Sequence, residues 1–249
     1  MRIETPVVSS ISASGSEAEG LEYVQVCSIP RKASVSPRAA KAGRPRIPPR
    51  PGPDEAGVDA RERIVRTAYE LFTQNGLGAV GVDRIVAEAG VAKTTLYRHF
   101  RSKDDLIAEV LQRHHQLWLR DWLEPETRKR GASPAGRLLA VFETVNEWFG
   151  DNNFQGCLLI NSLLEAHDRS STVRDAANTA IDDVYVFLER LAIEAGAPEP
   201  KRLAQQLHLL LRGTIVAATQ GRPVAVQEAS LLGRQLVEHA LPPPALPRR

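Results

Sequence analysis

Cysteine, methionine and long apolar runs are scarce in this sequence of 249 residues, which contains two cysteines and one methionine. Cys27 and Cys157 form no CxxC pair and fit no metal-ligand spacing. No apolar run approaches the roughly 18 residues that a membrane helix requires, and the N-terminal residues lack the basic start and apolar stretch of an export signal. We therefore expect a cytoplasmic protein with no membrane partner.

Signatures of enzymatic chemistry are also missing. The sequence contains neither a Gly-rich phosphate loop nor a nucleophile elbow. His114 and His115 are adjacent, so their rings point in different directions on a helix and cannot share a metal ion. We expect these histidines to be exposed or to lie at a seam between domains. The sequence thus predicts no catalytic residue, no cofactor and no metal site.

Positive charge is concentrated near the N-terminus, although the net charge of the whole chain is only +2. Seven basic residues and no acidic residue lie between residues 31 and 50, and residues 1–57 show no hydrophobic periodicity. We expect a disordered, basic, proline-rich extension there. Its "GRPR" motif, which contains Arg44 and Arg46, has the form of an arm that enters a minor groove. A solvated tail with only nonspecific contacts and, for part of it, a mis-chosen start codon are the alternatives.

Helical periodicity begins at Asp59, which forms a capping pair with Glu62 at the start of a helix that ends at Gly76. Two short helices are expected next, over residues 82–89 and 93–100, joined by a turn that contains a glycine. This arrangement predicts a helix-turn-helix whose second helix enters the major groove of DNA.

The second of these short helices carries the side chains that are suited to DNA. Leu96 and Phe100 are spaced to face inward together, which leaves the other faces for polar residues. The first turn of a helix favours phosphate because its free N–H groups and positive dipole end attract anions. Lys and Thr side chains there can also read base edges, and the longer side chains can hydrogen-bond to oxygens of the DNA backbone. The candidate DNA contacts are Lys93, Thr94, Thr95, Tyr97, Arg98 and His99, with Lys103 at the start of the next helix as a further positive charge.

Ser102 is expected to cap a long amphipathic helix that runs from Lys103 to about Trp122. Further helices are predicted by the apolar spacing between Ser133 and Trp148, in the "FQGCLLINSLLEAHD" segment, over residues 173–195, and in two terminal helices that end near residue 241. The fold class is therefore all-α. We predict a three-helix DNA-binding domain over residues 58–105, a helical domain for effector binding and dimerisation over 106–241, and a disordered tail over 242–249.

The motif "RIVRTAYELFTQNG…VDRIVAEAGVAKTTLYRHFRSKDDL" resembles the DNA-binding domain of the tetracycline-repressor (TetR) family over residues 63–106. The resemblance implies a dimer that reads a partly palindromic operator and is released when a small molecule binds the C-terminal core. It assigns DNA contacts to the same positions that the spacing singles out. One position departs from the family: Gly81 stands where the family usually has a Thr or Ser that caps the second helix and bonds a phosphate.

The two terminal helices carry more apolar surface than one core requires. In the TetR family, these helices form a four-helix bundle between two subunits, which implies a homodimer here. Leu203, Leu207, Leu210, Leu211, Thr214 and Ala218 are expected on the apolar face of the first of them, and Val226, Ala229, Leu232 or Gly233, and Leu236 on that of the second.

A ligand pocket in the helical domain is expected to be apolar with a few polar groups. Asn161 is the best polar candidate because it interrupts the apolar run "CLLINSLL". Each candidate also has an ordinary role in a core, and Cys157 has no neighbouring base or resolving thiol in the sequence that would make it a redox trigger. The remaining candidate lining residues are Trp148, Phe149, Phe154, Cys157, Tyr185 and His208.

Two functions are compatible with these sequence features. The first is a DNA-binding transcription regulator, a repressor by family habit, that responds to a small-molecule effector. The second is a helical ligand-binding or interaction protein that binds DNA only nonspecifically. Binding to duplex DNA at increasing salt separates them, because only a specific reader retains a preferred site.

Overall fold

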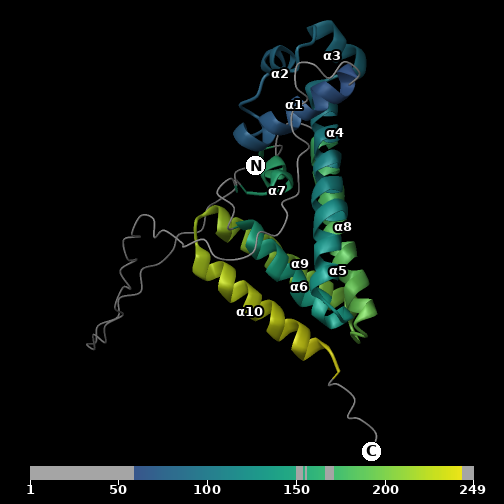
Figure 1. Cartoon of the computed structure of the whole chain (residues 1–249), viewed down its shortest axis with the longest axis vertical. Helices are drawn as coiled ribbons and strands as arrows, with labels where there is room; N and C mark the ends of the chain where they lie inside the picture. The colour runs from purple at the N-terminus through teal and green to yellow at the C-terminus, as the bar shows by residue number, and fades with distance from the viewer. Residues whose placement is uncertain (1–58, 150–153, 155, 166–170, 243–249) are drawn as a thin grey trace, which may run out of the picture. The chain divides into compact units, whose positions relative to one another are not determined.

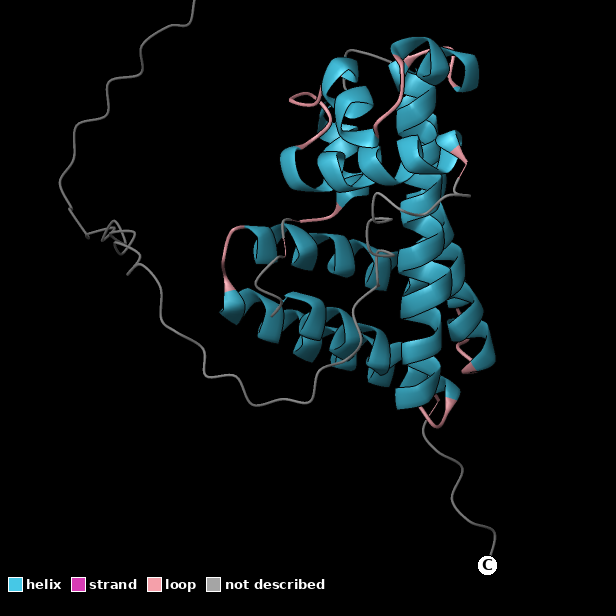
Figure 2. Ribbon diagram, turned by 45° about the horizontal axis from the view of Figure 1, so that its top comes forward, coloured by secondary structure: helices cyan, strands magenta, loops and turns pink. Residues whose placement is uncertain are grey.

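The computed structural model describes residues 59–149, 154, 156–165 and 171–242, and this part of the chain contains helices and no strand (Figure 2). The helices in chain order are α1 (Ala60–Asn75), α2 (Val82–Ala89), α3 (Lys93–His99), α4 (Lys103–His115), the π-helix η1 (Gln116–Leu123), α5 (Glu124–Arg130), α6 (Pro134–Phe149), α7 (Leu158–Glu165), α8 (Ser171–Glu194), α9 (Pro200–Thr219) and α10 (Pro223–Ala240). The predicted all-α class is confirmed. The predicted N-terminal extension, with Arg44 and Arg46, and residues 243–249 lie outside the described residues.

Helices α1, α2 and α3 pack together, and α1 also packs against α4 (Figure 1). Ile64, Leu71 and Phe72 are buried on the inner face of α1, and Gly76 ends the helix with a positive φ of 80°, which favours glycine. The predicted capping pair is wrong. Asp59 makes no side-chain capping bond, and the carboxylate of Glu62 is instead 2.6 Å from the guanidinium of Arg113 on α4.

The α2–α3 turn has the expected geometry. Gly90 adopts a left-handed conformation with φ 63°, and the Val91 N–H donates to the Val86 carbonyl, which completes the end of α2. Leu96 and Phe100 are 0% and 4% exposed, so the predicted inward pair is confirmed. Burial of a side chain of this kind stabilises the folded state by about 1.5–3 kcal/mol. These two side chains therefore fix the inner face of α3 against the domain and leave its outer face free.

Ser102 caps α4 as predicted, since its hydroxyl accepts from the Asp105 N–H at 3.1 Å. The expectation of one regular helix to about Trp122 needs correction, because the chain changes to a π-helix after His115 and then continues as α5 to Arg130. Pro125 supplies a physical reason. It has no N–H, and in a regular α-helix its ring would clash with the carbonyl four residues earlier, which favours a wider turn before it.

The helices from α5 to α10 form the second packed region, in which α8 lies beside α4 and contacts α6, α7 and α9 (Figure 1). Ser133 precedes α6 and accepts from the Gly136 N–H at 3.0 Å, so the predicted start is confirmed. Gly196 follows α8 with a φ of 74°, as expected for the residue that stops this helix. The core therefore continues from α4 into these helices.

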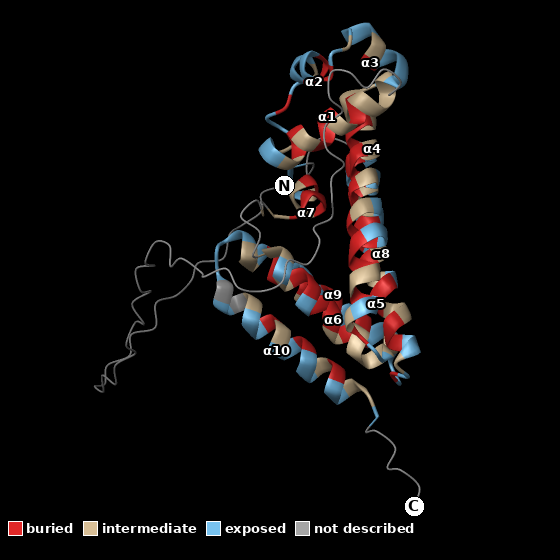
Figure 3. Cartoon of the chain, viewed as in Figure 1, coloured by how far each residue is buried: buried red, intermediate tan, exposed pale blue. Residues whose placement is uncertain are grey.

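The predicted apolar faces of α9 and α10 are largely buried or half-buried. Leu203, Leu207, Leu211 and Thr214 are buried on α9, and of the two alternatives on α10 Gly233 is buried whereas Leu232 is 48% exposed. Val237, which was not predicted to face inward, is 1% exposed as well. Gly233 allows close packing, since a Cβ there would lie 3.0 Å from a ring carbon of Phe142 on α6. The outward side of α10 is largely exposed (Figure 3).

Candidate nucleic-acid interface and ligand site

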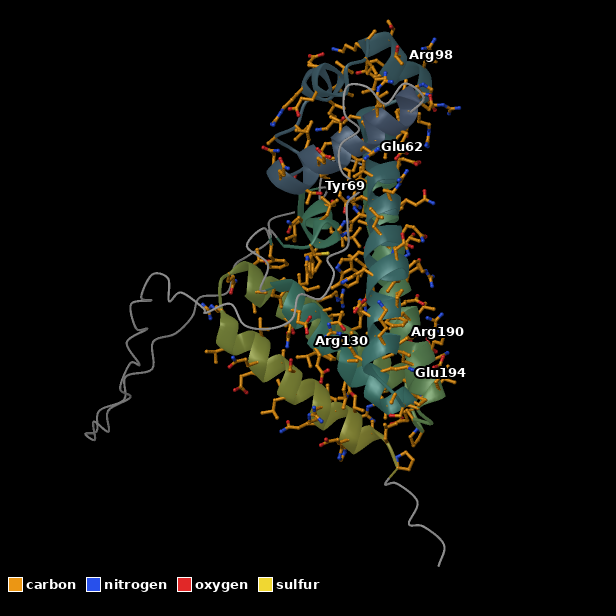
Figure 4. The ribbon with its side chains drawn as sticks, viewed as in Figure 1. Glu62, Tyr69, Arg98, Arg130, Arg190 and Glu194 are labelled. Atoms are coloured by element: carbon orange, nitrogen blue, oxygen red, sulfur yellow. The ribbon has the colours of Figure 1, made fainter. Side chains whose placement is uncertain are left out.

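Helix α3 presents a polar outer face. Its buried residue is Leu96, whereas Tyr97 is 47% exposed and Thr95 is half-buried. Arg98 projects outward near the end of α3 (Figure 4). The structure therefore brings six of the predicted DNA contacts onto one short helix, and those that are exposed are Lys93, Thr94, Tyr97, Arg98 and His99.

Lys93 is paired within the protein. Its ammonium lies 2.7 Å from a carboxylate oxygen of Asp83 on α2, and both side chains are largely exposed. The hydrogen bond and the charge of Asp83 raise the pKa of Lys93, so the ammonium stays charged. An exposed pair of this kind stabilises a protein little, so a phosphate or a base oxygen can replace Asp83.

Lys103 is held more firmly than Lys93. Its ammonium donates to the Leu77 carbonyl at 2.6 Å and lies 5.8 Å from the ring centroid of Phe72. Lys103 is half-buried, and its ammonium lies against the segment that joins α1 to α2. A phosphate contact by Lys103 would have to be shared with this carbonyl, a constraint that the sequence did not reveal.

The N-terminus of α2 has no side-chain cap. Gly81 occupies the capping position with an extended backbone (φ −85°, ψ 158°), and a Cβ built there would meet nothing within 4 Å. The position is therefore open to larger side chains. The absence of a hydroxyl leaves the first N–H groups of α2 available to an external acceptor such as a phosphate.

A buried polar contact joins α1 to α4. The Tyr69 hydroxyl lies 2.9 Å from Nδ1 of His114, which is 7% exposed, so His114 lies at the seam between helices rather than on the surface. Burial, together with a smaller effect of the neighbouring His115, lowers the pKa of His114 to about 4. The ring is therefore neutral near pH 7.

Cys157 is a buried free thiol, and its charge interaction with Tyr69 contributes to the raised pKa of that phenol after the larger effect of burial. Burial also raises the pKa of the Cys157 thiol itself, although backbone N–H groups of Ile160 and Leu159 act in the opposite direction. A protonated thiol is a poor nucleophile. The geometry therefore supplies no activation of Cys157.

Two ion pairs and one loop contact also link the N-terminal helices to the rest of the chain. Arg61 and Glu109 lie 2.9 Å apart between α1 and α4, in addition to the contact of Glu62 with Arg113. The Gly78 N–H, between α1 and α2, donates to a carboxylate oxygen of Glu165 at the end of α7 at 2.7 Å. A displacement of α4 or α7 would therefore also move α1 or the loop that follows it.

The predicted pocket residues separate into groups. Trp148, Phe149 and Phe154 form ring contacts with centroid separations of 4.8–5.7 Å. Tyr185 lies beside His208, 6.2 Å between centroids, and no ring contact between the two groups is found among the described residues. Burial, followed by Arg212, lowers the pKa of His208 to about 4.

Asn161 lies on α7 and is half-buried, close to Gly156, where a Cβ would approach its side-chain nitrogen to 3.3 Å. Two aromatic neighbours of the first group were not predicted from the sequence: Trp118 and Trp122 of η1, whose ring centroids lie 5.8 Å and 6.2 Å from that of Trp148. The available signal was the tryptophan count, since these three are all the tryptophans of the chain.

A separate groove of about 430 Å³ lies between α4 and α8. Glu109, His115 and Asp183 are among its lining residues, and His115 Nε2 lies 2.9 Å from an Asp183 carboxylate oxygen. None of the seven predicted pocket residues lines this groove. Within the described ranges, no group of three or more His, Cys, Asp or Glu side chains is placed to hold a metal ion.

Two regions of the chain match known families. Residues 64–110 match the family described as "Bacterial regulatory proteins, tetR family", and residues 134–230 match "Tetracyclin repressor-like, C-terminal domain". A crystal structure of a putative TetR transcriptional regulator from Streptomyces avermitilis is 30% identical, with a TM-score of 0.66 over 74% of this chain and 98% of that one. The chain belongs to the TetR family.

Curated relatives agree with membership of the TetR family. The transcriptional repressor NemR of Escherichia coli K12 is 28% identical over 182 residues, which cover 70% of this chain and 90% of NemR. The transcriptional activator FasR of Mycolicibacterium smegmatis is 32% identical over 137 residues, 53% of this chain and 60% of FasR. These relatives are named as transcription regulators of opposite sign. DNA-binding transcription regulation is therefore the function of this TetR-family chain.

A membrane-spanning helix is not found in the described part of the chain, since no helix there combines sufficient length with sufficient apolar character.

Proposed function

We propose that this TetR-family protein is a cytoplasmic repressor that binds a palindromic operator as a homodimer and leaves it when a small molecule binds the helical domain. The observation that carries the proposal is the exposed polar face of α3, held by Leu96 and Phe100 after a glycine turn. In this proposal, residues 58–105 form the DNA-binding domain and residues 106–241 form the effector-binding and dimerisation domain.

The proposed DNA contacts have two roles. Lys93, Thr94, Thr95 and Arg98 read base edges in the major groove, where short polar and basic side chains distinguish base pairs. Tyr97, His99 and Lys103 bind the phosphate backbone and set the position of α3 on the duplex. Arg44 and Arg46 remain proposed minor-groove contacts of the extension.

Exposed apolar residues on α9 and α10 support the proposed dimer. Leu209 and Val216 are 66% and 45% exposed, and seven residues apart they share one side of α9. Val224 and Leu231 repeat this spacing on α10, with 66% and 50% exposed. Two apolar stripes on adjacent helices suit a two-fold interface in which each subunit contributes the same surface.

Release of DNA is proposed to act through α4. This helix is tied to α1 by Tyr69–His114 and by the two ion pairs, and it continues into η1 and α5. A shift of α4 would carry the recognition helix with it. Because two half-sites are read at a defined spacing, a small change in the separation of the two α3 helices weakens binding. The effector must favour that arrangement energetically.

The experiment that tests the proposal is selection of DNA from a random pool by the purified full chain at about 150 mM salt, where nonspecific phosphate binding is weakened. The same selection of DNA is carried out in parallel with a shorter chain that starts at residue 59. We expect one inverted repeat from both, with weaker binding by the shorter chain if the extension contacts DNA. Recovery of no common motif would reject sequence-specific regulation in favour of nonspecific DNA binding.

A further inference from the structure

All three tryptophans of the chain meet in one cluster together with Phe149 and Phe154. Trp118 and Trp122 come from η1, Trp148 from the end of α6, and their ring centroids are 5.8–6.2 Å apart. Phe154 lies against Trp148 at 4.8 Å in an edge-to-face arrangement. We call these five residues the tryptophan cluster.

Two polar atoms of the tryptophan cluster are left without partners. Trp118 and Trp122 are 4% and 5% exposed, and neither indole N–H has a hydrogen-bond acceptor among the described residues. The great majority of buried polar groups in proteins are hydrogen-bonded, and an unmade bond at a buried donor is unfavourable. Two such donors on successive turns of one helical segment therefore require an explanation.

The segment that carries them is itself unusual. π-Helical turns are rare in proteins and occur frequently at functional sites. Here the π-helix η1 follows α4 directly, and α4 contacts α1 through the Tyr69–His114 bond. A molecule that binds the indoles would therefore contact the same helical run that is proposed to control the DNA-binding helices.

We propose that the tryptophan cluster binds a planar aromatic effector whose oxygen or nitrogen acceptors receive the indole N–H groups of Trp118 and Trp122. This inference rests on the proposed function, since it names the class of effector. Aromatic rings that meet edge-to-face can exchange a protein ring for a ligand ring at similar cost. The two unpaired N–H donors favour a ligand that carries hydrogen-bond acceptors. An ammonium cation has no acceptor atom, and an aliphatic chain would leave both donors unsatisfied.

The alternative location, the groove between α4 and α8, is less suitable for such a ligand. Its lining includes Asp105, Glu109 and Asp183, which provide acceptors rather than donors. These three carboxylates disfavour a ligand whose polar atoms are hydrogen-bond acceptors.

The test is a titration of the full chain, labelled with ¹⁵N at tryptophan, in which the three indole N–H signals are followed by NMR. Three probes are compared: coumarin, which is planar and has a carbonyl acceptor; naphthalene, which has the same ring size and no acceptor; and tetraethylammonium. We expect coumarin to move the signals of Trp118 and Trp122 downfield, as new hydrogen bonds do, and to bind more tightly than the other two probes.

Single substitutions to Phe separate the hydrogen bonds from the aromatic surface. Trp118→Phe and Trp122→Phe each remove one unpaired N–H and are expected to weaken coumarin binding about fivefold, as for loss of one hydrogen bond. Trp148→Phe is the matched control, because Trp148 belongs to the tryptophan cluster but is not one of the buried unpaired donors. We expect a smaller loss of affinity for coumarin in this variant.

The NMR titration tests the ligand site independently of DNA binding. Equal binding of naphthalene and coumarin, or equal losses in all three variants, would overturn the role of the indole N–H groups. No response of any indole signal to the aromatic probes would overturn the site itself. If the indoles respond while DNA selection yields no motif, the ligand site stands and the proposed regulatory function fails.

Discussion

The Tyr69 hydroxyl on α1 is hydrogen-bonded to Nδ1 of His114 on α4, at 2.9 Å, in a buried position. This bond connects the helices that support α3 to the helical run that leads to the tryptophan cluster. Since both groups are buried, each depends on the other for a partner.

Replacement of Tyr69 by Phe removes the hydroxyl and leaves Nδ1 of His114 without this bond. We expect the free energy of unfolding to fall by about 1–3 kcal/mol, the usual cost of an unsatisfied buried polar group. Urea denaturation measures this change. Tyr97→Phe is the control, because it makes the same chemical change on an exposed residue of α3. An equal stability for Tyr69→Phe and the wild type would show that the bond contributes nothing.

The protein is expected to lose stability as the pH falls from about 6.5 to about 4. Burial lowers the pKa of His114 to about 4 in the folded state, below its usual value of 6.5, so the unfolded chain binds more protons within this window. At pH 5 the expected loss is about 2 kcal/mol relative to pH 7 for this one residue.

His114→Gln checks the assignment of that loss, since an amide can still hydrogen-bond to Tyr69 but does not titrate. Unfolding in urea at pH 5 and pH 7 should show a smaller difference in this variant than in the wild type. His208 retains its own lowered pKa of about 4, so part of the dependence remains. Identical differences in both proteins would assign the effect to other groups.

Gly81→Ser is expected to tighten DNA binding about fivefold, because the hydroxyl adds one hydrogen bond to a phosphate at the start of α2. The backbone of Gly81 is extended and its surroundings are open, so serine fits without strain. Gly81→Ala is the control for filling the position without a hydroxyl. Fluorescence anisotropy with the selected operator measures both, and equal affinities for the two variants would contradict the prediction.

Lys93→Ala should reduce the preference for the selected operator, with a loss of about 1–3 kcal/mol that is concentrated at the base pair it reads. Asp83→Asn is the opposite test, since it removes the carboxylate that pairs with Lys93 and should tighten binding. A panel of operators with single base changes distinguishes loss of specificity from a uniform loss. Unchanged discrimination by Lys93→Ala would remove this residue from the base-reading set.

Leu209→Asp is expected to shift the protein from dimer to monomer in sedimentation measurements, because a charge would be buried in the proposed α9–α10 interface. Leu164→Asp provides the matched control. Leu164 is also a largely exposed leucine, at 73%, but lies on α7 outside those helices. A monomeric wild type, or an equal effect of the two substitutions, would reject this surface as the interface.

Much of the helical organisation was predictable, because its causes are local. Ser102 and Ser133 cap the helices that follow them. Gly90 ends α2 in a left-handed conformation that other residues adopt only at an energetic cost. The inward pair of Leu96 and Phe100 follows from spacing alone. These signals lie within a few residues of the structure they specify.

Contacts between distant segments were not predictable in the same way. The assignment of Glu62 to a local cap was wrong because Arg113, on another helix, offers it a charged partner. Lys103 was expected to add a positive charge on the DNA-contacting side, and its ammonium also donates to the Leu77 carbonyl.

The sequence by itself determined the family, the helix-turn-helix and the polar face of α3, because periodicity, caps and turns act over short stretches of chain. Only the tertiary structure decided that Tyr69 meets His114 and that the three tryptophans meet in one cluster. Those contacts depend on how α1, α4, η1 and α6 pack, and the buried surroundings that result lower the pKa of His114 and leave two indole N–H groups without acceptors among the described residues.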